Sequence, residues 1–222
     1  MDGSGTLFGE FAAALGARTI IASYPRDRAL DYEALDRLVE ALLPRDEPYV
    51  LLGESFSGPI AIRIAARRPA GLRAVILVCT FAMLGSKRAP TFVRALISQL
   101  PFWKLPVSFG TSVLLGRWDS TAMRSKLRAA IKFVAPVVWR TRLRSVLEVD
   151  VTSQLRLIEV PLLYLRASED RLVPIEAAKL VLNSNPLVRL VTVKGPHGLL
   201  QTQPEPCARA IREFAQQVGI AW

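Results

Sequence analysis

The sequence predicts an α/β fold in which a mostly parallel sheet carries helices on both faces and a helical segment is inserted between two strands. Short, nearly continuous apolar runs alternate with stretches whose apolar residues recur at helical spacing, as is typical of parallel strands covered on both sides. The alternation stops between residues 82 and 150 and then resumes. We therefore expect a first core part over residues 1–81, a helical cap over 82–150 and a second core part over 151–222.

Five apolar runs are expected to form strands, because each is short, rich in aliphatic residues and bounded by turn residues or proline. They span residues 18–25, 49–54, 72–80, 160–168 and 187–195. The expected helices span residues 31–44, 58–69, 175–183 and 205–218. In the first of these helices Asp31 is the expected N-cap, Leu35, Leu38 and Val39 share one face, and Pro44 ends the helix.

The inserted segment is expected to be helical, with breaks at Pro90, Pro101, Pro106 and Pro136. It also accounts for the net charge of +10, since twelve of the 29 Lys and Arg residues but only one of the 19 acidic residues lie between positions 81 and 147. Two interpretations stay open. The basic side chains either form the solvated face of an amphipathic cap or recruit an anionic carrier or lipid surface. No nucleic-acid recognition motif accompanies this charge, so we expect no nucleic-acid partner.

One serine stands in the turn between an expected strand and an expected helix, in the sequence VLLGESFSGPIAIRIAARRP at positions 50–69. A turn tight enough to expose Ser55 pushes its backbone towards positive φ and crowds the residues two positions to either side, so both must be small. Gly53 and Ser57 meet this requirement, and Gly58 follows. The usual pattern is G-x-S-x-G, from which Ser57 departs. A glycine-rich turn that only packs the helix against the strand is the alternative to a nucleophilic Ser55.

The chain offers one base and a few acids that could activate this serine. His197 is the only histidine, and it lies in a Gly-Pro-flanked loop directly after the last expected strand. Glu169 and Asp170 follow the preceding strand, and Asp170 is preferred because it stands just before an expected helix; Asp150 is a reserve candidate. Because parallel strands end at one edge of a sheet, Ser55, Asp170 and His197 are expected to meet there.

With nucleophile, acid and base in this chain order, the sequence resembles the α/β-hydrolase superfamily, and looks closest to its small, bacterial, carboxylesterase-like members with a helical cap. The motifs that carry the resemblance are GESFSG, ASEDRLVP and GPHGLLQTQPE, and the resemblance covers nearly the whole chain. It implies the α/β-hydrolase fold, with the helical cap in the inserted segment.

The same resemblance implies an oxyanion hole built from backbone N–H groups. One donor is expected to be Phe56, which follows the nucleophile. The second is expected from Met1 or Asp2 in the opening MDGSGTLF, which looks like the end of a glycine-containing loop. The strands that normally precede such a loop are absent from the sequence. We therefore expect a sheet that lacks the first strands of the fold and has an exposed edge.

These features predict a serine hydrolase that cleaves carboxylic esters or thioesters through an acyl-enzyme on Ser55, with His197 as the base and Asp170 as the orienting acid. No metal and no organic cofactor are expected, and the expected partner is a small acyl ester or thioester. An acyltransferase, a cofactor-free haloperoxidase or a C–C hydrolase could use the same triad, and a non-catalytic binding protein is the alternative from another class.

The sequence also bears on where the protein acts. No apolar run reaches the ~18 residues of a membrane span, and the first residues lack the pattern of a signal peptide. Cys79 and Cys207 fit neither a metal nor a redox spacing. We therefore expect reduced thiols and a cytoplasmic protein, with a disulfide between the two cysteines as the open alternative.

Overall fold

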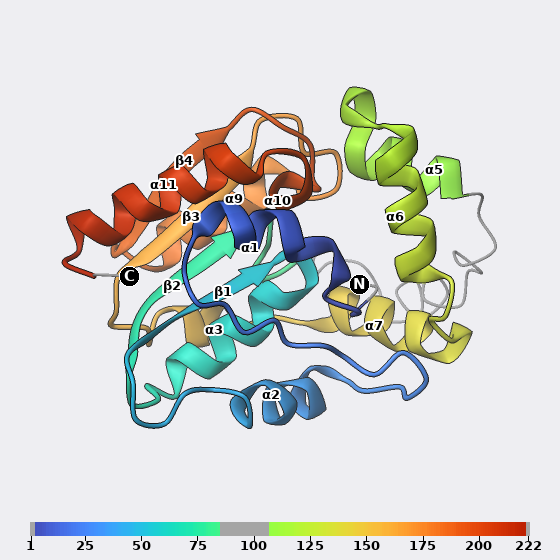
Figure 1. Ribbon diagram of the computed structural model, residues 1–222. Coiled ribbons are helices and arrows are strands. Elements are labelled where there is room, and N and C mark those ends of the chain that lie inside the picture. The colour runs from blue at the N-terminus through green and yellow to red at the C-terminus, as the bar shows by residue number, and fades with distance from the viewer. Residues whose placement is uncertain (1–2, 85–106, 221–222) are drawn as a thin grey trace.

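The computed structural model describes residues 3–84 and 107–220, and it contains a four-stranded sheet in the order β1-β2-β3-β4 (Figure 1). The strands are β1 (Tyr49–Glu54), β2 (Leu72–Val78), β3 (Leu162–Ala167) and β4 (Val188–Val193). Every neighbouring pair of strands is parallel. The parallel sheet expected from the sequence is therefore confirmed, and four of the five expected strands form.

Helices surround this sheet, and further helices lie within residues 107–155 of the segment between β2 and β3. The described α-helices are α1 (Gly9–Leu15), α2 (Tyr32–Glu40), α3 (Gly58–Ala66), α5 (Val107–Leu115), α6 (Thr121–Ile131), α7 (Pro136–Glu148), α8 (Thr152–Leu155), α9 (Ile175–Ser184), α10 (Leu199–Thr202) and α11 (Pro204–Gln217). Short 3₁₀ helices are η1 (Thr6–Phe8), η2 (Ser55–Ser57) and η4 (Gly116–Trp118). All four helices expected outside the inserted segment are present.

Helix α2 begins as the sequence predicts and ends earlier. The carboxylate of Asp31 accepts a hydrogen bond from the backbone N–H of Ala34 at 2.9 Å, so Asp31 is the N-cap. The helix ends at Glu40 rather than at Pro44. A proline ring disfavours helical backbone in the residue before it, so the last turn cannot reach Pro44 itself.

The segment 18–25, expected to be a strand, forms no strand. Its aliphatic side chains are poorly covered, with Ile20 54% and Ile21 38% exposed. A β-branched run becomes a strand only where a neighbouring strand completes its backbone hydrogen bonds. Here β1 is the edge strand of the sheet, and the N–H of Tyr24 instead donates to the carbonyl of Gly3 at 2.7 Å. The expectation is wrong because local propensity cannot supply that missing neighbour.

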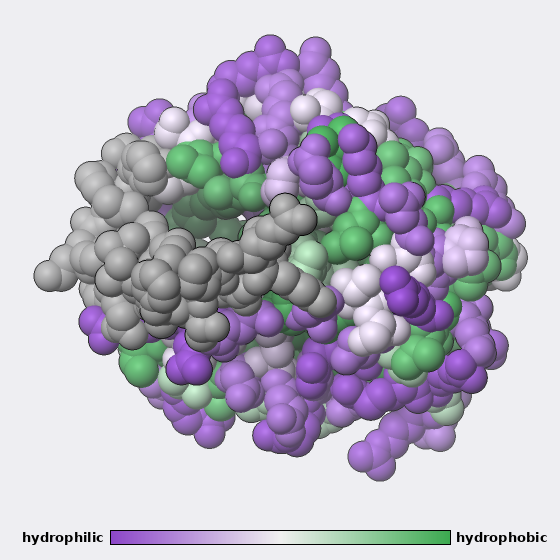
Figure 2. Space-filling view, turned by 180° about the vertical axis from the view of Figure 1, so that it is seen from behind, coloured by the Kyte–Doolittle hydropathy of each residue, from purple (hydrophilic) through white to green (hydrophobic). Residues whose placement is uncertain are grey.

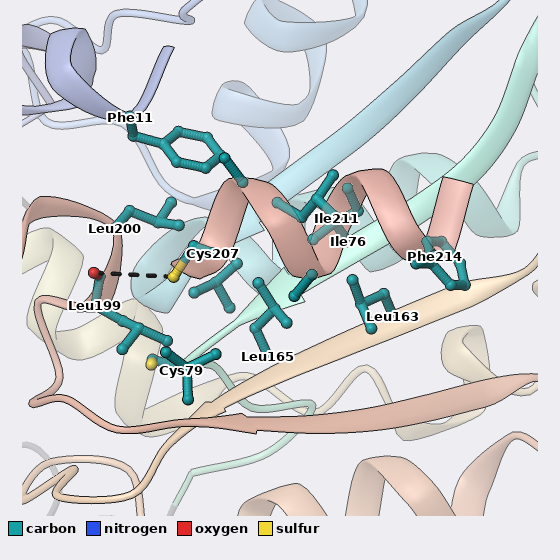
Figure 3. Packing of buried hydrophobic residues seen from close by; sticks show 14 of the residues in the cluster. Phe11, Ile76, Cys79, Leu163, Leu165, Leu199, Leu200, Cys207, Ile211 and Phe214 are labelled. Atoms are coloured by element: carbon teal, nitrogen blue, oxygen red, sulfur yellow. Dashed lines mark hydrogen bonds between the residues drawn. The ribbon is translucent and has the colours of Figure 1, made fainter. Parts of the chain in front are cut away.

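The sheet is covered on both faces, because successive side chains of a strand point to opposite sides. On one face, Ile76 of β2 and Leu163 of β3 belong to a buried cluster with Phe11 of α1 and residues of α11 (Figure 3). On the other face, Leu77 and Tyr164 belong to a cluster with residues of α3, α8 and α9. The predicted two-sided covering of the sheet is therefore confirmed.

Cys79 and Cys207 are both free, and both lie buried in the cluster that α1 and α11 form with the sheet (Figure 3). The Cys207 thiol donates to the carbonyl of Leu199 at 4.0 Å. Burial raises the pKa of the Cys207 thiol to about 12, and it also raises the pKa of the Cys79 thiol. The two side chains therefore serve as small apolar core residues rather than as reactive thiols.

Helices α5, α6 and α7 follow β2 in the chain and lie beyond the carboxyl ends of the strands (Figure 1). Residues at the two ends of the inserted segment are paired, through an antiparallel bridge between Met83 and Asp150 and a hydrogen bond from the N–H of Val151 to the carbonyl of Ala82 at 2.9 Å. The division into core and cap at these positions stays a prediction. Within residues 3–84 and 107–220, no helix is long and apolar enough to span a membrane.

The side chain of Asn185 holds the loop before β4, and a substitution can test this role. Its side chain is 2% exposed and donates to the carbonyls of Leu155 and Ile158 at 2.8 and 2.9 Å, while its oxygen accepts from the N–H of Leu187 at 2.9 Å. The substitution Asn185→Ala should lower the free energy of unfolding in urea by about 2–4 kcal/mol, because it leaves buried backbone groups without partners.

The matched control is Asn183→Ala, since Asn183 is exposed on the preceding helix. Its free energy of unfolding should change by less than about 0.5 kcal/mol. Equal effects of the two substitutions would show that the buried amide does not hold this loop.

Candidate active site

Ser55 stands in the turn that joins β1 to α3, and its backbone φ is 50°, as the sequence predicts. The turn leaves no room for larger neighbours. A Cβ on Gly53 would lie 2.7 Å from the carbonyl oxygen of Ser57, and a Cβ on Gly58 would lie 1.9 Å from Oγ1 of Thr80. Real Cβ atoms do not approach other atoms so closely. The small residues around Ser55 are therefore a requirement of the turn.

Three hydroxyl groups from outside the turn hold its three residues in place. Oγ1 of Thr80 donates to the carbonyl of Ser55 at 2.5 Å, and the hydroxyl of Tyr32 donates to the carbonyl of Phe56 at 3.1 Å. The hydroxyls of Tyr24 and Ser57 share a hydrogen bond of 3.0 Å. The side chain of Ser57 thus makes a contact that glycine could not make. Sequence reasoning missed these tyrosine and threonine residues, since no spacing links them to the turn.

The side chain of His197 lies between Ser55 and Asp170. Nδ1 of His197 lies 3.0 and 2.9 Å from the two oxygens of Asp170, and Nε2 lies 2.7 Å from Oγ of Ser55. An ionised carboxylate only accepts hydrogen bonds, so Nδ1–H is the donor to Asp170. In the neutral ring Nε2 is then the acceptor, and the Ser55 hydroxyl donates to it. The structure therefore brings together the three residues that the sequence analysis selected.

The loops after β3 and β4 hold the acid and the base side by side. The N–H groups of Ser168 and Glu169 donate to the carbonyls of Val193 and Gly195, each at 2.9 Å, which extends the strand pairing into the loops. The N–H of Gly198 donates to the carbonyl of Leu114 in α5 at 3.2 Å, so the histidine loop is also tied to the inserted helices. The position of His197 is thus fixed from two sides.

The other acids considered from the sequence have different partners. Glu169 pairs with Arg117 and accepts from the indole N–H of Trp118 at 3.2 Å. Asp150 accepts from the backbone N–H of Thr152 at 3.0 Å. Asp170 is the carboxylate that receives the Nδ1–H bond of His197.

The side chain of Asp170 is 4% exposed, and burial and hydrogen bonding shift the pKa of its carboxyl in opposite directions. Burial alone would raise the pKa of this carboxyl. The hydrogen bond from His197, the charge of its protonated ring, and the backbone N–H groups of Val173 and Leu172 together outweigh burial and lower the pKa of Asp170 below its ordinary value. Asp170 is therefore ionised at neutral pH and can orient a protonated His197.

The backbone donors expected for an oxyanion are only partly within the described structure. Phe56 is buried directly after Ser55 in η2. Met1 and Asp2 lie outside the described residues. Gly3, the next residue, has a φ of 76° and lines the same pocket as Ser55, so the opening loop does reach the site. The oxyanion donors stay a prediction.

Glu54 is a further buried group beside the nucleophile that sequence reasoning missed. It directly precedes Ser55, and its Oε2 accepts a hydrogen bond from Nε2 of Gln201 at 2.9 Å. Burial raises the pKa of the Glu54 carboxyl above its ordinary value, although the Gln201 hydrogen bond and the charge of a protonated His197 oppose this. The site therefore contains one acid held in its ionised form and one biased towards its neutral form.

A pocket of about 940 Å³ opens onto Ser55 and His197. Its walls come from the opening loop, the serine turn, the histidine loop and helices α5, α6 and α7, and most of its lining side chains are apolar, among them Leu127, Trp139 and Leu143. On the face drawn in Figure 2, hydrophobic residues line part of a hollow. The arrangement suits an apolar group held next to an activated hydroxyl.

Known proteins resemble this chain over most of its length. The profile of the alpha/beta hydrolase family matches residues 3–210. The chain is 27% identical over 194 residues to the biotin biosynthesis bifunctional protein BioHC of Cellvibrio japonicus, covering 82% of this chain and 38% of that protein. It is 28% identical over 148 residues to mouse monoglyceride lipase, covering 63% and 47%. A hydrolase structure from Oleispira antarctica aligns with a TM-score of 0.82 and 15% identity over 97% of this chain and 88% of that one.

The chain therefore belongs to the alpha/beta hydrolase family. The fold and the three loops that carry Ser55, Asp170 and His197 agree with this assignment. It spans less than half the length of the two curated relatives described above. At 15% identity, the solved structure supports the fold alone.

The contact between Gly58 and Thr80 gives a direct test of the turn. The substitution Gly58→Ala should lower the free energy of unfolding by about 1–3 kcal/mol, because the new methyl group displaces Thr80 from the Ser55 carbonyl. Gly9→Ala is the matched control, since Gly9 has nearly the same helical backbone, with φ of −58° against −59°, and no atom within 4 Å of its added Cβ. Chemical denaturation should find the control unchanged or slightly stabilised. Similar losses in both variants would contradict the steric requirement.

The raised pKa of Glu54 predicts a pH-dependent cost to stability. The folded protein binds the Glu54 proton more tightly than the unfolded chain, whose carboxyl titrates near the ordinary value of 4.5. The folded state therefore loses stability as the pH rises from about 4.5 through the pKa of folded Glu54. The substitution Glu54→Gln removes this loss, so the variant should be more stable than the wild type at pH 7.

Urea unfolding of both proteins between pH 4 and pH 8 measures this difference. The stability advantage of Glu54→Gln should shrink towards pH 4, where the wild-type carboxyl is protonated in both states. An advantage that stays constant over this range, or a variant that is less stable at pH 7, would contradict the burial of a carboxyl with a raised pKa.

Proposed function

We propose that this chain is a serine hydrolase that cleaves carboxylic esters or thioesters through an acyl-enzyme on Ser55. The observation that carries the proposal is the continuous hydrogen-bonded line from Ser55 through His197 to Asp170, with steps of 2.7 and 2.9 Å, at the wall of a largely apolar pocket. A serine hydroxyl needs an adjacent base to become a useful nucleophile, and the base needs an orienting group on its other nitrogen. The names of the relatives, among them a monoglyceride lipase, support an ester substrate.

In the first half of the proposed reaction, Oγ of Ser55 attacks the acyl carbonyl carbon while its proton passes to Nε2 of His197. The carbonyl becomes an oxyanion, and the backbone N–H of Phe56 is proposed to donate to it. The bond to the leaving alcohol or thiol then breaks, and the leaving group takes the proton from His197. Asp170 stays ionised throughout and stabilises the imidazolium.

In the second half, a water molecule gives one proton to Nε2 of His197 and attacks the acyl carbon. The bond to Oγ of Ser55 breaks, Ser55 recovers its proton from His197, and the carboxylic acid leaves. The proposed steps use a substrate, water and the chain's own groups. The low exposure of His197, 5%, keeps bulk water from competing for the Nδ1–H bond to Asp170.

Substitution of the nucleophile and the base tests this proposal. Ser55→Ala and His197→Ala should each lower kcat on a p-nitrophenyl ester by about 10³-fold or more. Ser55, His197 and Asp170 are proposed to act as one unit, so the loss of either the nucleophile or the base disables the whole unit. A fluorophosphonate probe followed by peptide mass spectrometry should label Ser55 in the wild type and nothing in Ser55→Ala.

Ser57→Ala serves as the comparison, because Ser57 stands two residues after the proposed nucleophile. The probe should still label Ser55 in this variant, and it should leave Ser57 unlabelled in the wild type. Near-normal ester turnover by Ser55→Ala, or labelling of Ser57, would rule out the proposed mechanism. Labelling of Ser55 without turnover of any ester or thioester would contradict hydrolysis and favour acyl transfer to another acceptor.

A further inference from the structure

We propose that the substrate of this site joins an apolar acyl chain to a leaving group that carries a phosphate, and that Arg128 and Lys132 bind the phosphate. The inference rests on the proposed function, because it names the substrate class of the same serine site. It starts from the lining of the pocket, in which an apolar stripe and a basic stripe of one helix stand next to each other.

Helix α6 and its C-cap residue, Lys132, contribute both stripes. Met123, Leu127 and Ile131 line the pocket, and they recur every four residues along one face of the helix. Arg128 and Lys132, each one position further along, also line the pocket. One position along an α-helix is a rotation of about 100°, so the basic stripe borders the apolar stripe. A substrate that lies along α6 would meet both.

Four described basic residues of this region that do not line the serine pocket have acidic partners. Ion pairs join Arg117 to Glu169, Arg124 to Asp119, Lys126 to Glu10 and Arg144 to Glu148. Neither Arg128 nor Lys132 has a carboxylate within 4.0 Å in the part of the chain that the structure describes; Nζ of Lys132 instead lies 5.2 Å from the ring centre of Phe133. Arg128 and Lys132 are thus two pocket-lining cations whose charge no carboxylate of the described residues matches at this distance.

The charge balance of the pocket favours an anion. Arg128, Lys132 and Arg140 all line it, whereas Glu54 is the one acid among the described lining residues. Burial raises the pKa of that carboxyl and so weakens its negative charge. A phosphate monoester carries nearly two negative charges at neutral pH, and guanidinium and ammonium groups both bind its oxygens through charge-assisted hydrogen bonds. A phosphate therefore matches the two unpaired cations better than a neutral headgroup does.

The exposure of Arg128 and Lys132 to water limits how strongly they can change KM. Arg128 and Lys132 are both exposed, so water screens their attraction to an anion. We expect the pair to change KM by about tenfold rather than by several thousandfold. The value of kcat should change little, because the phosphate would lie away from the reacting carbonyl.

The experiment compares two esters that differ only in the phosphate, 1-decanoylglycerol and 1-decanoylglycerol 3-phosphate. The wild type should have a KM about tenfold lower for the phosphate ester. The double variant Arg128→Gln/Lys132→Gln should lose that preference, so that its KM values for the two esters become equal. The matched control is Arg156→Gln/Arg209→Gln, which removes two exposed charges from positions outside the pocket and should keep the preference.

Decanoyl-coenzyme A distinguishes the source of the phosphate. A preference for the thioester over 1-decanoylglycerol 3-phosphate assigns the site to a nucleotide-bearing carrier, and the reverse assigns it to a phospholipid-like headgroup. Equal KM values for the neutral and the phosphate esters, or a preference that the pocket variant and the control variant lose equally, would overturn the inference while leaving the proposed serine chemistry intact.

Calorimetry with decyl phosphate tests the anion site without any ester hydrolysis, because it measures binding alone. Its affinity should fall about tenfold in Arg128→Gln/Lys132→Gln and not in the control. If this difference appears while no ester is hydrolysed and Ser55 is not labelled, the anion site stands and the proposed function fails. Equal affinity of all three proteins would overturn the anion site.

Discussion

A serine with a backbone φ of 50° joins β1 to α3, and the contacts around it offset the strain of that conformation. A non-glycine residue in this region costs of the order of 1–3 kcal/mol. Hydrogen bonds from Thr80 and Tyr32 to the turn, and the shared bond between Tyr24 and Ser57, contribute roughly 1 kcal/mol each, which is comparable in size. The rest of the site depends on this balance, because only the strained turn presents the Ser55 hydroxyl to an imidazole.

The parallel sheet supplies the second requirement, which is a common edge for groups distant in sequence. The loops that follow β1, β3 and β4 carry Ser55, Asp170 and His197, and hydrogen bonds between the loops continue the pairing of β3 with β4. Asp170 and His197 are almost fully buried, at 4% and 5% exposure. A buried pair of this kind is stable only when each polar atom has a partner, and here the ring, the carboxylate and two backbone N–H groups satisfy one another.

The inserted helices give the site its pocket and most of its charge. Apolar side chains of these helices line the serine pocket, whereas the cations that are paired with acids lie outside it. Both interpretations of the basic segment stay predictions. Arg124, Lys126 and Arg144 form ion pairs outside the serine pocket, while Arg128 and Lys132 stand on its wall.

The sequence by itself determined which residues could form the site. A serine flanked by small residues, a single histidine and an aspartate after the preceding strand left few combinations, and apolar periodicity located four strands and the helices between them. Only the tertiary structure decided whether the segment 18–25 became a strand, because strand formation needs a neighbour that local sequence does not specify. It also decided which hydroxyls hold the serine turn and how burial sets Glu54 apart from Asp170, since desolvation and hydrogen bonding depend on residues brought together by folding.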